Sequence, residues 1–350
     1  MAEYHENNGK LSDSGEVYLI ELYNTNGGGM LVELPNGAVY GSLKVATRKR
    51  PELFQTTVLV EDFADDGAFI YVPKDVVMDK PLRIIDRYSS DEGQKSFSCT
   101  NIILVDSNAA LKVEYMLEAR GKGKFRINKR IRQFFGPDSR LEQCELIDNC
   151  AAAEVFSDMV IYQMSTSHTD LKVIKVGEGD AKFLYASDLK WVGSDTKYSV
   201  LYLCGRDEKV DVDISVRHNV PDCTSDVLVK GIAGGKATGS FKGLVYVAPD
   251  AQRTEAYQQS RSLLLSDAAR ILASPQLEIY ADDVRCSHGA TVGQQDGDEI
   301  YYMRQRGISE DQARSLQMTG FIHDVLDRIP EGSYRDMAAE KVSEKLQNIK

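Results

Sequence analysis

Short apolar runs recur along most of the chain and are separated by glycine, aspartate, asparagine and serine. They are rich in Val, Ile, Leu, Tyr and Phe, and few segments between residues 17 and 287 show helical spacing. Clear examples are residues 17–23, 68–72, 101–105, 111–115, 155–162, 198–203 and 243–247. Many short strands with turn signals at near-regular spacing predict an all-β core. The pattern alone does not choose among a sandwich, a barrel and a solenoid.

The pattern changes to helical spacing after Gly289. Asp296 and Glu299 are spaced as an N-cap and its N3 residue, and Gly307 stands where a C-cap glycine belongs. A second helix is predicted to begin with a capping box of Ser309 and Gln312. Its apolar stripe consists of Met318, Phe321, Ile322, Val325, Leu326 and Ile329.

A third helix is predicted from Ser333, with few apolar residues on its inner face. We expect this last helix to be mobile or to be stabilised by a partner. The predicted organisation is therefore a disordered tail over residues 1–14, a β core over residues 15–290 and a C-terminal α-helical domain over residues 291–350.

The composition narrows the class of protein. The net charge of −11 and the pI of about 5.1 argue against general binding of nucleic acid or of anionic membranes. No apolar run approaches the roughly 18 residues of a membrane helix. The six cysteines include no Cys-x-x-Cys pair, which favours reduced thiols in a cytoplasmic protein.

Cys286 and His288 form the main candidate site for chemistry. Apolar and polar residues alternate over residues 277–282, which is strand periodicity. If that strand continues, Cys286 and His288 point to one face together with Glu278 and Asp282, so we expect an outer face. A thiol beside an imidazole suits soft-metal or sulfur chemistry. Spacing alone favours a buried cysteine and a surface histidine, because two ligands do not complete a typical metal site.

Two segments around this pair resemble a known family. Residues 275–293 read PQLEIYADDVRCSHGATVG, and residues 251–266 read AQRTEAYQQSRSLLLS. Both are similar to the SufB/SufD family of iron–sulfur cluster assembly proteins, and residues 66–73, DGAFIYVP, resemble it more weakly. The Cys-Ser-His-Gly form at residues 286–289 is more like the SufD branch than the SufB branch.

The resemblance implies a fold and a role. It implies that the β core is a right-handed parallel β-helix. It also implies a non-catalytic scaffold subunit of the SufBCD complex, which pairs with SufB through the C-terminal end of the β core and forms a homodimer in isolation. Family members carry an N-terminal helical region, for which residues 1–14 leave little room.

The resemblance also assigns chemistry to the candidate site. Family positions that match Cys286 and His288 are implicated in building the nascent cluster near the contact between SufB and SufD. We therefore expect these two residues to bind iron or an iron–sulfur cluster transiently, with no permanently bound cofactor.

The C-terminal helices of the family bind SufC, an ABC-type ATPase. On this basis we expect SufC to dock on the helices at Ile300, Met303, Arg304, Phe321 and Val325. The same helices can also serve as a cap on the β core, because the apolar stripe must be buried against something.

Residues 120–132 contain seven basic residues and no acidic one. We expect a strand or hairpin with a solvated charged face; an anion- or RNA-binding strip is the alternative. The acidic chain weighs against RNA, and Gly121-Lys-Gly-Lys lacks the P-loop spacing, so the chain is not expected to hydrolyse ATP.

Two enzyme classes are the rival interpretations. Parallel β-helices also occur in carbohydrate-active enzymes, but no cleft of paired carboxylates can be placed from the sequence. Asp282 and Asp283 would point to opposite faces of a regular strand. A cysteine nucleophile at Cys286 with His288 as base is the second rival. His168 and His218 are expected to be surface or hydrogen-bonded histidines.

Overall fold

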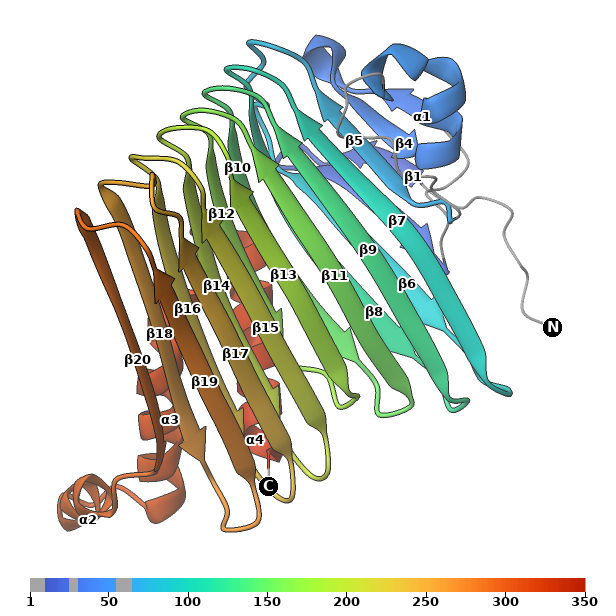
Figure 1. The fold of residues 1–350 in the computed structure, drawn as a ribbon. Helices are drawn as coiled ribbons and strands as arrows, with labels where there is room; N and C mark the ends of the chain where they lie inside the picture. The colour runs from blue at the N-terminus through green and yellow to red at the C-terminus, as the bar shows by residue number, and fades with distance from the viewer. Residues whose placement is uncertain (1–9, 25–30, 55–64, 350) are drawn as a thin grey trace.

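The computed structural model describes residues 10–24, 31–54 and 65–349, and most of them stack into two long β-sheets (Figure 1). Each sheet contains ten strands, and successive strands from β5 to β20 alternate between the two sheets. Each pair of strands with its two turns makes one coil, and strands in successive coils are parallel. The predicted parallel β-helix is confirmed.

The bounds of the strands define the two sheets. The first sheet contains, in spatial order, β1 (Lys10–Asp13), β2 (Tyr18–Tyr23), β6 (Leu82–Ser89), β8 (Ala110–Arg120), β10 (Arg140–Asn149), β12 (His168–Lys175), β14 (Asp195–Cys204), β16 (Thr224–Ala233), β18 (Thr254–Leu264) and β20 (Val284–Gln294). The second sheet contains β3 (Leu31–Glu33), β4 (Val39–Ser42), β5 (Ala68–Val72), β7 (Lys95–Val105), β9 (Phe125–Phe135), β11 (Ala153–Gln163), β13 (Ala181–Leu189), β15 (Lys209–His218), β17 (Thr238–Val247) and β19 (Arg270–Ile279). Only the pairs β1–β2, β3–β4 and β4–β5 are antiparallel among these strands.

One turn of the coil repeats the same backbone conformation along the solenoid, although no single residue type marks its position in the sequence. Where the chain passes from the second sheet to the first, one residue in every coil before the last has a left-handed φ. These residues are Asp75, Asn108, Asp138, Thr166, Gly193, Asp222 and Arg253. They recur about every 30 residues, which is the period of a solenoid. Different residue types fill the same position, so no strict repeat is visible by eye.

The two sheets differ in what covers their outer faces. Strands of the second sheet alternate buried and exposed residues, as in β9 and β13, because their outer face meets solvent. Strands β10, β14 and β16 of the first sheet carry continuous buried runs. Such runs require cover on both faces, and two C-terminal helices supply it on the outside.

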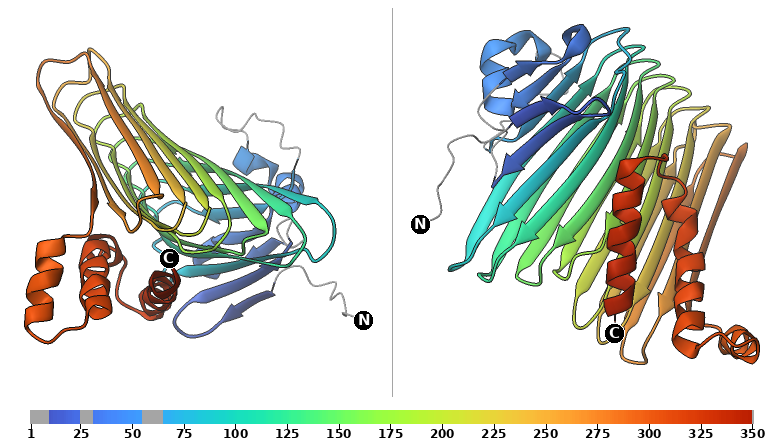
Figure 2. Two further views of the ribbon diagram at one scale, coloured as in Figure 1. Left: turned by 90° about the horizontal axis from the view of Figure 1, so that it is seen from below. Right: turned by 180° about the vertical axis from the view of Figure 1, so that it is seen from behind.

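The helices lie mostly at the C-terminal end of the chain. They are α1 (Leu43–Lys49), α2 (Gly297–Gln305), α3 (Glu310–Leu326) and α4 (Ser333–Asn348), with two short 3-10 turns, η2 (Pro35–Gly37) and η3 (Pro51–Phe54). Figure 2 shows α3 and α4 lying along the outer face of the first sheet, while α2 projects beyond its end.

The predicted caps of these helices are confirmed. The carboxylate of Asp296 accepts hydrogen bonds from the backbone N–H groups of Asp298 and Glu299 at the start of α2. Ser309 and Gln312 form both bonds of the capping box at the start of α3. The stripe of α3 packs on the first sheet, so these helices do cap the β core.

The last helix is more firmly held than its composition predicts. Tyr334 is buried, and its hydroxyl donates to the carbonyl oxygens of Tyr115 and Cys144 at 2.7 and 3.2 Å. Ala338 and Val342 are also buried against the sheet. The expectation that α4 needs a partner for its apolar face is wrong, because the outer face of the first sheet is that partner.

A buried ionic cluster fixes the C-terminal part of α4. Lys345 Nζ lies 2.7 Å from the Glu208 carboxylate, and Lys175 Nζ from the neighbouring coil lies 3.3 Å from it. Both ammonium groups also donate to the carbonyl oxygen of Gly177. Burial lowers the pKa of Lys175, and the Glu208 carboxylate opposes this shift. One carboxylate therefore holds two lysines from different elements.

Two expected boundaries need correction, and one helix was not expected. Residues 10–13, expected in the disordered tail, form β1 and pair with β2; residues 1–9 lie outside the described residues. The β core continues to the end of β20 at Gln294 rather than ending at residue 290. Helix α1 interrupts the β core near its start, where the Ser42 side chain caps it.

Replacing Glu208 by Gln tests the buried cluster. The variant leaves two buried ammonium groups without their carboxylate, which typically costs about 3–5 kcal/mol of unfolding free energy. The matched control is Glu178→Gln, which breaks an exposed pair with Arg206 at 3.2 Å and should cost less than about 1 kcal/mol. Urea unfolding followed by circular dichroism measures both, and equal stability of the two variants would contradict the prediction.

Candidate functional site

The C-terminal end of the solenoid is open at both sheets. β20 is the last strand of the first sheet and β19 is the last strand of the second, so each pairs on one side only among the described strands. Edge strands present unpaired backbone N–H and C=O groups, and proteins normally protect them. Helices α3 and α4 cover the outer face of the first sheet and leave this end uncovered (Figure 2).

Cys286 and His288 both lie on β20, at the open end. Their register partners on β18 are Ala256 and Gln258, which are buried in the interior. Alternation along a strand therefore places Cys286 and His288 on one face, as the sequence predicts, but that face is the inner one. The expected outer face is wrong because β19 ends at residue 279 and the chain turns into the other sheet before β20 begins.

The thiol of Cys286 has an apolar environment. Its half-buried side chain packs against a small cluster that includes Val245, Val247 and Ala256. Burial raises the pKa of the Cys286 thiol, and a hydrogen bond with the backbone of Ala256 opposes this shift. At neutral pH the free chain therefore holds a protonated thiol, which becomes a ligand when a metal ion displaces the proton.

The imidazole of His288 is exposed at the end of the solenoid. Among the described residues, no group of three or more His, Cys, Asp or Glu side chains is arranged to hold a metal ion. Cys286 and His288 can thus offer sulfur and nitrogen ligands at one edge, but a full coordination set needs donors from outside these residues.

The sequence of this chain matches a known protein family over a range that includes β19 and β20. Residues 87–321 match the family described as SUF system FeS cluster assembly, SufBD core domain. That match covers more than half of the 350 residues and includes the whole open end.

The chain belongs to the SufBD core family.

Individual relatives agree with this assignment. The chain is 32% identical to the iron–sulfur cluster assembly protein SufD of Escherichia coli over 161 residues, which are 46% of this chain and 38% of that protein. It is 27% identical to SufD of Bacillus subtilis over 281 residues, 78% of this chain and 63% of that protein. The resemblance to the family, and to SufD in particular, is confirmed.

A chloroplast protein also matches. The chloroplastic protein ABCI7 of Arabidopsis thaliana is 27% identical over 288 residues, which are 80% of this chain and 60% of that protein. The matched segments span less than two thirds of each of these three relatives.

The expected SufC-docking residues of this SufBD core protein divide into two groups. Ile300 and Val325 are buried within the helical region, so they stabilise it rather than face a partner. Arg304 is exposed and pairs with Glu310 at 3.3 Å. Met303 and Phe321 are partly exposed, and the Phe321 ring lies under the Lys230 ammonium.

The outer side of α2 carries exposed aromatic residues that the sequence analysis did not single out. Tyr301 is 62% exposed and Tyr302 is 57% exposed. The guanidinium of Arg306 lies 4.5 Å from the centroid of the Tyr302 ring. Which face of α2 meets solvent depends on how the helix leaves β20, so no local sequence pattern could identify these two residues.

The basic stretch of residues 120–132 is distributed over two sheets. It begins at the end of β8 and continues into β9, so it is a strand–turn–strand crossover and not a hairpin. Lys129 points inward: it is 2% exposed and its Nζ lies 3.5 Å from the centroid of the Tyr115 ring. The expected solvated face therefore describes only part of the stretch.

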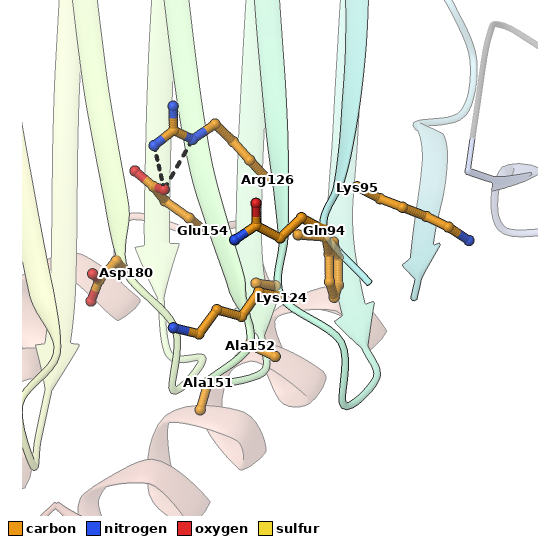
Figure 3. Close-up of a pocket in the computed structure, with 10 residues that line it drawn as sticks. Gln94, Lys95, Lys124, Arg126, Ala151, Ala152, Glu154 and Asp180 are labelled. Carbon is orange, nitrogen blue, oxygen red and sulfur yellow. Dashed lines mark hydrogen bonds and ion pairs between the residues drawn. The ribbon is translucent and has the colours of Figure 1, made fainter. Parts of the chain in front are cut away.

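The exposed part of the stretch borders an open pocket of about 420 Å³. Figure 3 shows Lys124 extending across it, with Asp180 on the far side. Arg126 is paired with Glu154 at 2.7 Å, so an anion would compete with that carboxylate. This mixed charge does not resemble a dedicated RNA- or phosphate-binding site.

The remaining candidates have structural explanations. His218 is buried and its Nε2 lies 2.9 Å from the Ser225 hydroxyl; burial lowers its pKa to about 4, so the ring is neutral. His168 is exposed, with its Nδ1 3.9 Å from the Asp195 carboxylate. Asp282 and Asp283 lie in the turn before β20, so the expected placement on opposite faces of one strand is wrong.

Among the described residues, no helix combines the length and the apolar character that a bilayer crossing requires.

The raised pKa of Cys286 predicts slow alkylation at neutral pH. Only the thiolate reacts with iodoacetamide, so the rate should be below that of an unburied thiol at pH 7 and should increase as the pH approaches the raised pKa. Peptide mass spectrometry measures adduct formation at Cys286 over time, with Cys286→Ser as the blank. Rapid modification at pH 7 without pH dependence would contradict the prediction.

Proposed function

We propose that this SufBD core protein is a non-catalytic scaffold subunit in iron–sulfur cluster assembly, and that it presents its open end to the nascent cluster. The family assignment supports the process. One observation carries the site: Cys286 and His288 share the inner face of β20, where the described part of the chain leaves both strand pairing and metal coordination incomplete. A second chain can complete both at once.

The partner at this end is proposed to be a SufB-type subunit. The edges of β19 and β20 offer backbone hydrogen bonds to any chain that presents matching strands, and extension of an exposed sheet edge is a common mode of recognition. Without that subunit, a second copy of this chain can cover the same edges. The proposal therefore includes a homodimer in isolation that uses the heterodimer surface.

The chemistry proposed for the site is transient binding of iron or of the forming cluster as cargo. Cysteine sulfur and histidine nitrogen are both known ligands of iron–sulfur clusters. A thiol with a raised pKa stays protonated until a metal ion displaces the proton, so the cargo itself turns Cys286 into a ligand. An incomplete ligand set favours release to an acceptor over permanent retention.

Neither enzyme alternative is favoured. A nucleophilic cysteine needs a lowered pKa, whereas burial raises that of Cys286. The family match and the SufD relatives point to an assembly subunit rather than to a carbohydrate-active enzyme.

Changing Cys286 to Ser and His288 to Ala together tests the site. We expect the double variant to assemble normally with cognate SufB-type and SufC-type subunits but to give a lower cluster yield in reconstitution, because two cluster ligands are lost. The yield is measured by the visible absorbance of the cluster, and assembly is measured by size-exclusion chromatography.

Ser287→Ala is the matched control for this experiment. Ser287 lies between the two residues on β20, and alternation places it on the outer face. Its variant should retain the wild-type yield. A wild-type yield from the double variant would remove Cys286 and His288 from the proposed function.

The C-terminal helices are proposed to dock an ABC-type ATPase of the SufC kind. Support comes from the projection of α2 beyond the sheet (Figure 1) and from a groove of about 830 Å³ beside α3 and α4. Met318, Ile322 and Leu346 contribute apolar surface to this groove. The exposed residues Tyr301 and Tyr302 join Met303, Arg304 and Phe321 as proposed contacts.

Changing Tyr301 and Tyr302 to Ala tests this docking surface. Tyrosine is enriched among the few interface residues whose truncation costs about 2 kcal/mol or more, so we expect the double variant to bind cognate SufC at least tenfold more weakly. Isothermal titration calorimetry measures the affinity. The control is Leu272→Ala on the outer face of the second sheet, where Leu272 is 72% exposed. Equal affinities of both variants would exclude α2 from the interface.

A further inference from the structure

A long polar side chain with no partner lies in the interior directly below the open end. Gln258 is 2% exposed, and neither its Nε2 nor its Oε1 atom makes a hydrogen bond among the described residues. An unsatisfied buried polar group destabilises the fold, and each one in a native structure calls for an explanation. The group therefore points to a partner that this arrangement of side chains does not show.

The chain makes room for this amide in a specific way. A Cβ atom added to Gly243 on β17 would lie 2.2 Å from Gln258 Oε1 and 2.5 Å from its Cδ. The amide thus crosses the interior from the first sheet and rests on the backbone of the second, where only glycine fits. The Gln258 amide therefore has a specific place in the interior, which a side chain at position 243 would occupy.

The next coil offers one nitrogen-containing side chain above this amide. Gly243 pairs in register with Pro275, which has no backbone N–H to donate. Gln258 pairs in register with His288. The other inward residues of β20 near it are Cys286 and Ala290, so His288 is the one whose ring can donate an N–H to an amide oxygen.

The imidazole has space to change rotamer, because His288 is exposed at the end of the solenoid. A cavity of about 270 Å³ also borders β18 and β20, but it lies on the outer face, because Asp226, Tyr257 and Ser287 on its wall alternate with the inward row of Gln258 and His288. Ser260, beside Gln258 on the same face, is also buried without a partner, but the residue above it is Ala290, which has no polar side chain.

We propose that Gln258 is a positioning residue for His288. The imidazole turns inward from the open end and donates one ring N–H to Gln258 Oε1. The other ring nitrogen keeps its lone pair and faces the end of the solenoid. The value of this contact for cluster assembly rests on the proposed function, whereas the contact itself does not.

The consequence is a fixed tautomer. A histidine that binds a metal commonly donates its second ring N–H to a carbonyl or carboxylate, which orients the ring and sets which nitrogen is the ligand. An exposed histidine without such a partner samples both tautomers and several rotamers. Gln258 would give His288 one orientation before any second chain or metal arrives.

Nitrogen NMR of the full chain, labelled with ¹⁵N-histidine, tests the contact. The spectra are recorded at pH 8, and the His288 signals are assigned by their loss in His288→Gln. Wild-type His288 should show one dominant tautomer. Gln258→Met, which keeps the length of the side chain but has no carbonyl, should give the mixture typical of a free imidazole. Gln258→Glu, which keeps an acceptor oxygen, should restore one tautomer.

Ser260→Ala is the matched control, because it removes a neighbouring buried polar group and should leave the tautomer of His288 unchanged. The same tautomer ratio in wild type and in Gln258→Met would overturn the proposal. If Gln258→Met fails to fold, Gln258→Asn replaces it, since its shorter amide should not reach the ring. A wild-type tautomer ratio in Gln258→Asn would likewise count against the contact.

The test separates this proposal from the proposed function. If the tautomer does not depend on Gln258 but loss of Cys286 and His288 lowers cluster yield, the positioning role fails and the function stands. If the tautomer depends on Gln258 but loss of Cys286 and His288 leaves the cluster yield unchanged, the contact between Gln258 and His288 is supported and the proposed assembly site is wrong.

Discussion

Stacking of one coil on the next is the constraint on which this protein depends. A single coil of two strands cannot bury its apolar side chains or satisfy its backbone, so each coil needs a neighbour on both sides. Between β6 and β18 every strand of the first sheet has two such neighbours. At β19 and β20 the stack stops, and the chain leaves by α2 without covering the end. The candidate ligands Cys286 and His288 lie where this stacking interaction is missing.

The helices follow from the same constraint in the lateral direction. The outer face of the first sheet is apolar over its central strands, and α3 and α4 bury it. Their attachment is reinforced by polar contacts that cross between elements, such as Lys230 with Asp324 and Lys345 with Glu208. The helical region is therefore coupled to several coils at once. A load applied to α3 or α4 by a partner would reach the β-helix through these contacts.

The interior near the open end combines apolar and polar support. Cys286 rests on small aliphatic residues, which keep its thiol neutral. His288 lies two residues further along the same strand, in register with Gln258. The side-chain amide of Gln258 fits in the interior because the residue opposite it is Gly243. Under the proposed function, this edge would separate the tasks of its two candidate ligands: the thiol would stay protonated until a metal replaces the proton, and the imidazole would be oriented in advance. Such a division would suit a scaffold that both receives and releases its cargo.

The sequence by itself determined the all-β core, the three C-terminal helices with their caps, and the nearness of Cys286 and His288 on one face of a strand. These features are local, because strand alternation, capping boxes and spacing by two involve residues within one turn or one strand. The parallel β-helix itself came from the resemblance of residues 251–293 to a family. No local pattern separates a solenoid from a sandwich, since the repeating turn position accepts Asp, Asn, Thr, Gly and Arg alike.

Only the tertiary structure decided which face Cys286 and His288 occupy, that α4 is buried, that Lys129 points inward, and that Gln258 lies beneath His288. Each depends on pairing between residues about 30 positions apart, as Gln258 with His288, or on contacts between the helices and distant strands. The face of a strand is set by where its sheet ends and turns, and one misplaced turn inverts every side chain. For that reason the candidate ligands could be named from the sequence, whereas the face of the strand on which they lie could not.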